Sequence, residues 1–268
     1  MNAITTAFLA GVMLLPLPSA AQWPKQRDRG VPRTHDGKPN LSAPVSRTRE
    51  GKPNLSGVWL PEPDPKGKPQ GVEQEVFPRY FVSITADLKP EEVPFTAPAA
   101  ATFKKHVESQ GRADPIAHCQ PTGVPRIGTI PLPYKIVQMP QLIIILYEEN
   151  TVFRQIFLDG RQLPNDPEPR YMGYSVGRWE GDTLIVDSTG FNDRSWLDGI
   201  GHPHSDQLHV IERFLRRDIG HLVVQVTIDD SKTYTKPLMY TQRQTLLPDD
   251  ELFEHFCTDN EKDIAHYK

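Results

Sequence analysis

The chain has 268 residues, 37% of them hydrophobic, and a formal net charge of −4. This length and apolar content suffice for one hydrophobic core of ordinary size. Proline is unusually frequent at 27 residues, which argues against a helical bundle because proline breaks helix interiors. The mildly acidic balance argues against nucleic acid as a partner, since surfaces that bind nucleic acid are basic. No apolar run after the N-terminal residues approaches about 20 residues, so we expect no membrane insertion.

Residues 1–21 have the pattern of a secretory signal peptide. They contain no charged side chain, and an apolar stretch from Ala7 to Leu17 precedes the small residues Ser19 and Ala21. Small residues at these two positions are typical of a cleavage site after Ala21. The sequence therefore predicts an exported protein, either periplasmic or secreted.

Residues 22–56 form a basic segment, which we expect to be a flexible tail or one docked on the surface. They hold eight Lys or Arg against three acidic residues. They also contain a short tandem repeat, because 33–42 and 47–56 both end in Gly-Lys-Pro-Asn-Leu-Ser. Two copies are too few for a solenoid, which needs about three stacked units. We therefore expect one β-rich domain at 57–268 and assign no role to the basic tail.

The first part of this domain, from Gly57 to about Ile130, is predicted to be irregular because prolines recur throughout it. Within it, residues 98–110 carry apolar side chains at helical spacing and predict a helix. Cys119 and Cys257 are an even pair in a chain predicted to be exported. We expect a disulfide between them, with two independent buried thiols as the alternative.

After Pro131 the sequence changes to short β-strands separated by turn residues. The first two predicted strands are apolar on both faces, and the clearest hairpin turns at Glu180-Gly181-Asp182. About nine strands with short links predict an antiparallel meander, which closes into a lipocalin-like barrel or folds as a β-sandwich. The predicted strands are 136–139, 142–147, 152–158, 174–179, 183–188, 208–216, 222–228, 234–245 and 252–256.

Several long motifs carry a family resemblance. They are Gly-Lys-Pro-Asn-Leu-Ser-Gly-Val-Trp at 51–59, the run 171–187 with its continuation 189–198, and 204–213. With these motifs the chain resembles an uncharacterised family of exported bacterial proteins found in acidobacteria and some proteobacteria. The resemblance extends from about Gly51 to the C-terminus. It implies that His204, rather than His202, belongs to the shared pattern, and it implies no catalytic role.

The densest group of polar functional side chains lies between residues 187 and 213. A carboxylate beside a histidine fixes the imidazole tautomer and raises its basicity, which suits proton transfer. The candidates for catalysis are His204 or His209, each with Asp206 or Asp187 as its carboxylate partner. The candidates for substrate binding are the polar and aromatic side chains of Asp193, Asn192, Trp196, Tyr174 and Arg126.

These residues predict a metal-independent hydrolase, lyase or isomerase that acts on a small organic or glycosidic substrate. The alternative is a periplasmic barrel that binds a small-molecule ligand without catalysis. A further alternative is that the acidic residues serve as turn and capping residues in a long loop. Residues 173–177 spell Gly-x-Ser-x-Gly, but they lack the strand-to-helix context of a nucleophile elbow. We expect no cofactor, and the sequence does not set the oligomeric state.

A metal held by His202, His204 and His209 is one more alternative. Imidazole ligands suit zinc, iron or manganese. However, the His-x-His spacing lacks the glutamate that similar cupin sites place four or five residues later. His209 and Glu212 would also point to opposite faces of a regular strand.

Overall fold

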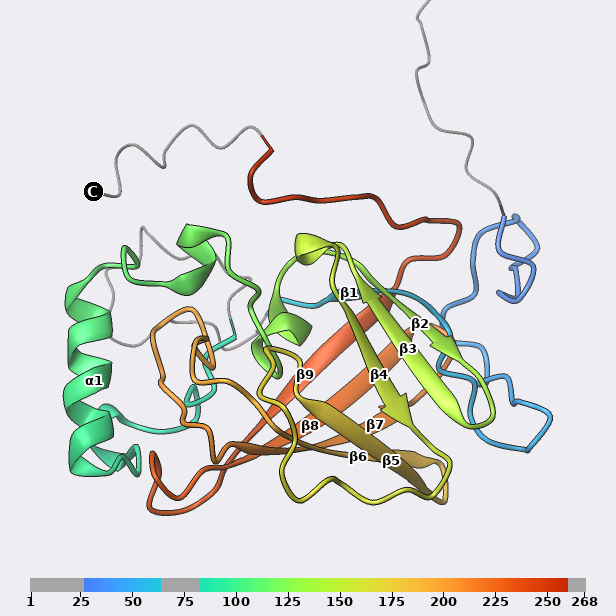
Figure 1. Cartoon of the computed structure of the whole chain (residues 1–268). Coiled ribbons are helices and arrows are strands. Elements are labelled where there is room, and N and C mark those ends of the chain that lie inside the picture. Colours follow the sequence, from blue (N-terminus) through green and yellow to red (C-terminus); the bar gives the residue numbers. More distant parts are fainter. Residues whose placement is uncertain (1–26, 64–81, 260–268) are drawn as a thin grey trace, which may run out of the picture.

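A computed structural model describes residues 27–63 and 82–259, and the predicted signal peptide lies outside these residues. The described strands close into a nine-stranded barrel, in which each strand pairs with the next and β9 pairs with β1 (Figure 1). The predicted barrel is therefore confirmed. The strands are β1 (Gly57–Pro61), β2 (Tyr134–Gln138), β3 (Leu142–Tyr147), β4 (Phe153–Phe157), β5 (Tyr174–Glu180), β6 (Thr183–Thr189), β7 (His209–Arg216), β8 (His221–Asp229) and β9 (Leu238–Leu246).

The barrel is mixed rather than wholly antiparallel. The pair β4–β5 runs parallel, whereas the other neighbouring strands run antiparallel. The reason is the link 158–173, which carries the chain back to the end at which β4 began. The predicted antiparallel meander therefore holds at every neighbouring pair of strands except this one. The predicted hairpin between β5 and β6 is confirmed.

The prediction of a last strand at 252–256 was wrong, because these residues are irregular. The backbone N–H of Phe253 donates instead to the side chain of Glu148 at 2.8 Å, which holds this segment against the short helix after β3. The strand that closes the barrel is β1, which pairs with both β2 and β9.

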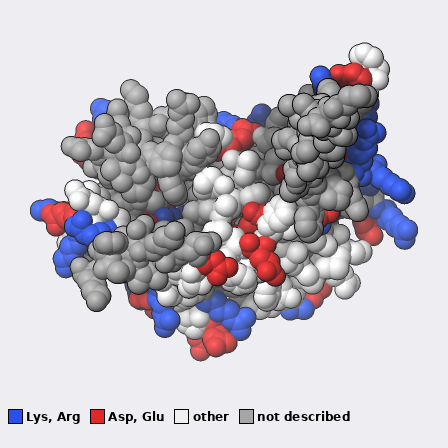
Figure 2. Space-filling view, turned by 90° about the horizontal axis from the view of Figure 1, so that it is seen from above, with Lys and Arg blue, Asp and Glu red and all other residues white. Residues whose placement is uncertain are grey.

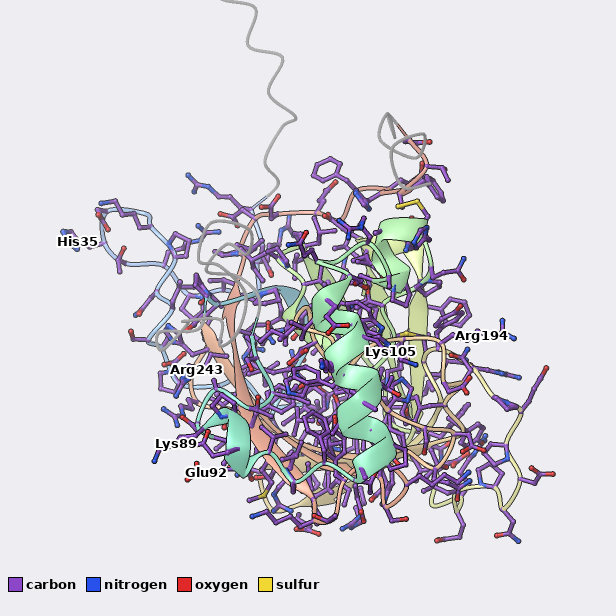
Figure 3. All side chains as sticks on the ribbon, turned by 90° about the vertical axis from the view of Figure 1, so that its left-hand side faces the viewer. His35, Lys89, Glu92, Lys105, Arg194 and Arg243 are labelled. Atoms are coloured by element: carbon purple, nitrogen blue, oxygen red, sulfur yellow. A yellow bond between two sulfur atoms is a disulfide. The ribbon has the colours of Figure 1, made fainter. Side chains whose placement is uncertain are left out.

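Among the described residues one α-helix, α1 (Ala97–Glu108), lies beside the barrel and confirms the helix predicted at 98–110 (Figures 1 and 3). Pro98 fits its first turn, where a missing N–H is tolerated. The 3₁₀ helices in the part of the chain that the structure describes are η1 (Pro90–Glu92), η2 (Pro115–His118), η3 (Arg126–Thr129) and η4 (Glu149–Thr151). No helix among the described residues is both long enough and apolar enough to cross a bilayer.

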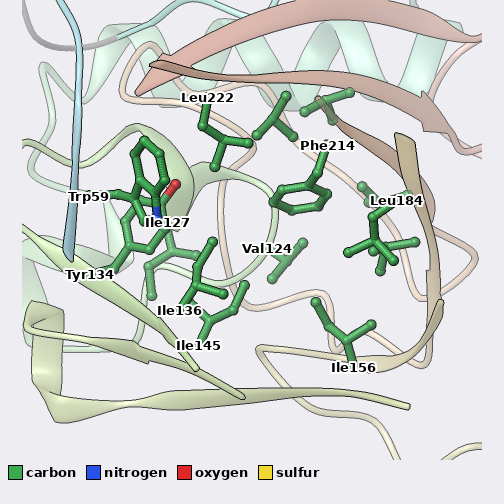
Figure 4. Packing of buried hydrophobic residues seen from close by; sticks show 14 of the residues in the cluster. Trp59, Val124, Ile127, Tyr134, Ile136, Ile145, Ile156, Leu184, Phe214 and Leu222 are labelled. Carbon is green, nitrogen blue, oxygen red and sulfur yellow. The ribbon is translucent and has the colours of Figure 1, made fainter. Parts of the chain in front are cut away.

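The barrel interior is filled by alternating side chains. In β8, Leu222, Val224, Val226 and Ile228 are at most 1% exposed, as the alternation in the sequence predicts. The segment around η3 also packs into this core through Val124 and Ile127 (Figure 4). Gln242 and Gln244 of β9 donate to backbone carbonyls of the same segment at 3.2 and 2.9 Å. The segment around η3 therefore helps to fill the barrel interior.

The two sequence repeats fold as two copies of one hairpin turn. The N–H of Thr34 donates to the carbonyl of Lys38 at 2.9 Å, and the N–H of Thr48 donates to the carbonyl of Lys52 at 2.8 Å. Each turn needs a residue with positive φ, which the glycine of the repeat supplies: φ is 80° at Gly37 and 76° at Gly51. Equal sequence has produced equal local structure.

These hairpins are docked on the barrel. Arg33 pairs with Asp249, and Arg47 makes a bidentate pair with Asp182 at 2.8 and 2.7 Å. Leu55, in the second repeat, is 1% exposed and belongs to the core. Over residues 27–56 the surface-docked alternative is therefore the one that the structure shows. Lys and Arg gather at the right-hand edge in Figure 2, the side on which this segment lies in Figure 1.

The predicted disulfide is confirmed. Cys119, which directly follows η2, is bonded to Cys257, with their Cα atoms 5.4 Å apart and 138 positions between them in sequence. The bond is visible beside the end of the described C-terminal segment in Figure 3. It ties that segment to the middle of the chain.

Candidate functional site

The buried carboxylate of Asp198 organises the loop between β6 and β7. One of its oxygens accepts the backbone N–H groups of Ile200 and Gly201 at 3.0 and 3.1 Å, and the other accepts that of Ile84 at 3.2 Å. Burial by itself would raise the pKa of Asp198, but the charge and hydrogen bonds of the neighbouring His202 and the backbone N–H of Ile84 hold it below its usual value. Asp198 therefore anchors the loop.

His202 is part of the same anchor. Its Nδ1 lies 2.7 Å from Asp198 Oδ2, and its Nε2 lies 3.2 Å from Thr85 Oγ1. The ring stacks on Phe103 of α1, with 4.6 Å between ring centroids. Both ring nitrogens are engaged in a buried position, so His202 joins the loop to α1 and to the segment around Thr85.

His204 faces a serine. Its Nε2 lies 2.9 Å from Ser195 Oγ, and its Nδ1 lies 3.1 Å from the backbone oxygen of Ser205. A carbonyl oxygen only accepts hydrogen bonds, so Nδ1 carries the proton and Nε2 accepts the Ser195 hydroxyl. Burial lowers the pKa of His204, which keeps the imidazole neutral at neutral pH. A serine beside a neutral histidine is one arrangement that activates a nucleophile.

The carboxylate that supports His204 is not the predicted one. Asp230 accepts both the N–H and the hydroxyl of Ser205, at 2.6 and 2.7 Å, and so holds the carbonyl that orients His204. Asp206 instead pairs with Lys232 at 2.7 Å on the surface. The sequence missed Asp230 because it lies beyond β8, well outside the polar cluster at 187–213.

His209 and Asp187 do contact each other, with 3.3 Å between Nε2 and Oδ1. The other oxygen of Asp187 accepts from Arg178 at 2.7 Å. The inward positions of β7 are Val210, Glu212 and Phe214, so His209 lies on the outer side of the wall. This pair is therefore partly exposed and separate from the buried contact of His204 with Ser195.

The remaining predicted binding residues have different surroundings. Trp196 is buried and stacks on His106 with ring centroids 4.5 Å apart. Arg126 is buried in a bidentate pair with Asp114 at 2.8 and 2.7 Å. Asn192 accepts the backbone N–H of Arg194 at 3.2 Å, and Asp193 is exposed. Only Tyr174 of this predicted set lines the cleft described below.

Nothing in the described part of the chain favours the metal alternative. In residues 27–63 and 82–259, no group of three or more His, Cys, Asp or Glu side chains is placed to hold a metal ion. The three histidines proposed as ligands have separate partners, Asp198 for His202, Ser195 for His204 and Asp187 for His209.

A buried ionic network crosses the barrel interior. Arg154 of β4 points inward and donates to Ser175 Oγ at 3.0 Å, to Ser188 Oγ at 2.8 Å and to the carboxylate of Glu212. The Arg154 and Glu212 side chains are 2% and 6% exposed. Although burial would lower the pKa of Arg154, the charge and hydrogen bond of Glu212 keep it above its usual value. Arg154 is therefore a permanently charged group inside the barrel.

A cleft opens where β4 and β5 separate. These strands pair at only two positions, Ile156 with Ser175 and Phe157 with Val176, so the preceding residues on each side diverge. The cleft has a volume of about 480 Å³, within the range of small-molecule sites. Its described lining is mainly aromatic and apolar with some polar groups: Pro121, Thr151, Val152, Phe153, Arg154, Gln155, Phe157, Arg170, Tyr171, Met172, Gly173, Tyr174 and Ser175.

One wall of the cleft is held in place by a stacked cluster. The rings of Phe157 and Tyr174 stack with centroids 5.3 Å apart. The guanidinium of Arg161 lies 3.9 Å from the centre of the Phe157 ring and donates to the Tyr174 hydroxyl at 3.1 Å. Asp159 in turn fixes Arg161 through hydrogen bonds of 2.6 to 3.0 Å. This wall is therefore preformed.

Most of the cleft was missed by the sequence analysis. The available signal was Arg154, a charged residue at the same inward position as Ile156 in an alternating strand. Ser175, the centre of the Gly-x-Ser-x-Gly match, contacts Arg154 and Ser188, which agrees with the expectation that it is not an elbow nucleophile.

Comparisons with known proteins found no protein-family model, no curated protein and no solved structure that matches this chain. The geometry of the cleft and of the buried contacts therefore carries the functional argument.

Proposed function

We propose that the protein binds a small aromatic or amphipathic organic molecule in the cleft between β4 and β5. The observation that carries this proposal is an opening in the barrel wall lined by Phe153, Phe157, Tyr171 and Tyr174. Phe153 is 60% exposed there, so a ligand would remove a large apolar surface from water. The sequence also predicted this function as an alternative, a barrel that binds a small molecule without catalysis. We place its binding site in the barrel wall between β4 and β5.

A neutral fluorescent probe, N-phenyl-1-naphthylamine, tests this proposal. We expect it to bind the wild-type protein with increased fluorescence. The substitution Phe153→Ala should weaken binding by about tenfold, since one aromatic contact contributes about 1 kcal/mol beyond its burial. Fluorescence titration measures both dissociation constants.

Met239→Ala is the matched control for this titration. Met239 is 66% exposed and lines a separate hollow of about 530 Å³ on the outer face of β8 and β9. Its substitution should leave the affinity unchanged. An affinity that falls with Met239→Ala and not with Phe153→Ala would place the probe elsewhere and contradict the proposal.

A second candidate function is the predicted acid–base enzyme, and the contact of Ser195 with His204 favours it. In an acyl transfer, Ser195 Oγ would attack an ester carbonyl while His204 Nε2 takes the hydroxyl proton and returns it to the leaving alcohol. Water would then release the acid. The base would be His204 as predicted, with Asp230, through Ser205, in place of Asp206.

A fluorophosphonate probe tests this second candidate. Ser195 Oγ would form a bond to phosphorus, fluoride would leave, and the proton would pass to His204. Because the pKa of His204 is lowered, the labelling rate should be flat near neutral pH and fall on acidification below about pH 6.5, the usual histidine value. Mass spectrometry should locate the label on Ser195 and find it in Ser175→Ala but not in Ser195→Ala. A protein that stays unlabelled would exclude this function.

We also propose that the protein is exported. The predicted signal peptide and the disulfide between Cys119 and Cys257 support the proposal, because stable disulfides are typical of oxidising compartments. Either proposed function would then operate in the periplasm or outside the cell.

A further inference from the structure

We infer that the ligand of the cleft between β4 and β5 is an anionic aromatic molecule, a ring system bearing a carboxylate or sulfonate, and that Arg170 binds its acid group. The inference rests on the proposed binding function and adds the charge of the ligand to it.

The charged side chains in the described lining of the cleft are both cationic. Its described lining includes the two arginines Arg154 and Arg170 and no carboxylate side chain. The Tyr174 hydroxyl accepts a hydrogen bond from Arg161 and keeps its own proton to donate. A carboxylate or sulfonate offers acceptors only, so it matches such a surface and forms charge-assisted hydrogen bonds with it.

The two guanidinium groups differ in how freely they can meet a ligand. Arg154 is buried and paired with Glu212, so withdrawing it would leave a buried carboxylate without its partner. The Arg170 side chain is 63% exposed and lies 3.0 Å from Glu168, which is 79% exposed. Such an exposed pair contributes at most about 1 kcal/mol, so a ligand anion can replace Glu168 at little cost.

The backbone under Arg170 is fixed, although its side chain is free to move. Its N–H donates to the carbonyl of Gly190 at 2.9 Å, and its carbonyl accepts the N–H of Asn192 at 3.0 Å. These bonds join the link 158–173 to the start of the loop between β6 and β7. The cation is thus held at the edge of the cleft, beside the aromatic wall.

Two dyes with the same rings test the inference. 8-Anilino-1-naphthalenesulfonate differs from N-phenyl-1-naphthylamine by the sulfonate alone. Arg170→Gln should weaken binding of the sulfonate dye by at least about tenfold, the low end for a charge-assisted hydrogen bond. It should change the affinity for the neutral dye by less than about twofold. Raising the salt concentration should weaken the binding of the sulfonate dye and leave that of the neutral dye unchanged.

Arg178→Gln is the matched control, because Arg178 is also an exposed arginine in ion pairs but lies on the outer side of β5 with Asp187 and Glu180. It should leave both affinities unchanged. If the neutral dye binds and responds to Phe153→Ala while Arg170→Gln has no selective effect on the sulfonate, the inference is overturned and the binding function stands. If neither dye responds to Phe153→Ala, the binding function itself fails.

Discussion

Replacing Glu212 with leucine is expected to lower the free energy of unfolding by about 3–5 kcal/mol, because it leaves the charge of Arg154 buried without a partner. The two side chains are 6% and 2% exposed. Arginine cannot escape this cost by losing its proton, since its pKa lies far above neutral pH. Urea denaturation of the wild-type and variant proteins measures the difference.

A double variant separates the effect of the unpaired buried charge from simple loss of packing. The double variant Arg154→Met/Glu212→Leu removes both charges and keeps apolar volume, so it should be more stable than Glu212→Leu alone. In the double variant Ser175 and Ser188 keep each other as partners, because their hydroxyl oxygens lie 2.9 Å apart.

Asp182→Asn is the control for an exposed ion pair. It breaks the pair with Arg47 and should cost less than about 1 kcal/mol. A loss below about 1 kcal/mol in Glu212→Leu would show that the barrel admits water to Arg154.

Features that depend on local sequence were predictable. Alternation in β8 identified its buried face because side chains of a strand point to opposite sides in turn. The turn residues at 180–182 identified the hairpin between β5 and β6, and helical spacing identified α1. In each case the determining residues lie within a few positions of one another.

Apart from the disulfide, the contacts between residues far apart in sequence were not predictable. The parallel pairing of β4 with β5 is set by the irregular link 158–173, which returns the chain to the end at which β4 began, and the cleft lies beside that pairing. The partners of Arg154 lie 21, 34 and 58 positions away. Asp206 is near His204 in sequence, yet Asp230 supports His204, because the start of the loop after β8 reaches Ser205. Closeness in sequence was a poor guide to closeness in space for these polar groups.

Removing the disulfide with Cys119→Ser/Cys257→Ser is expected to lower the free energy of unfolding by about 3–5 kcal/mol. The two cysteines are 138 positions apart, and in the chain-entropy model closing so long a loop removes much of the freedom of the unfolded chain. For a protein of this size the melting temperature should fall by about 10 °C. Differential scanning calorimetry measures the change, and the wild-type protein with reductant should show the same change.

When the disulfide is removed, local unfolding should begin at the C-terminal segment, residues 250–259. Besides the disulfide, that segment makes hydrogen bonds to the rest of the chain, among them those from the N–H of Phe253 to Glu148 and from the N–H of Cys257 to Asn150, at 2.8 and 3.4 Å. Without the disulfide, limited proteolysis should cleave within 250–259 before it cleaves the barrel. The barrel strands are protected because they form a continuous hydrogen-bonded wall. Simultaneous cleavage of segment and barrel would instead mean that the segment unfolds only together with the barrel. An unchanged melting temperature in the double variant would contradict this prediction. In the chain-entropy model, opening so long a loop gives the unfolded chain much more conformational freedom.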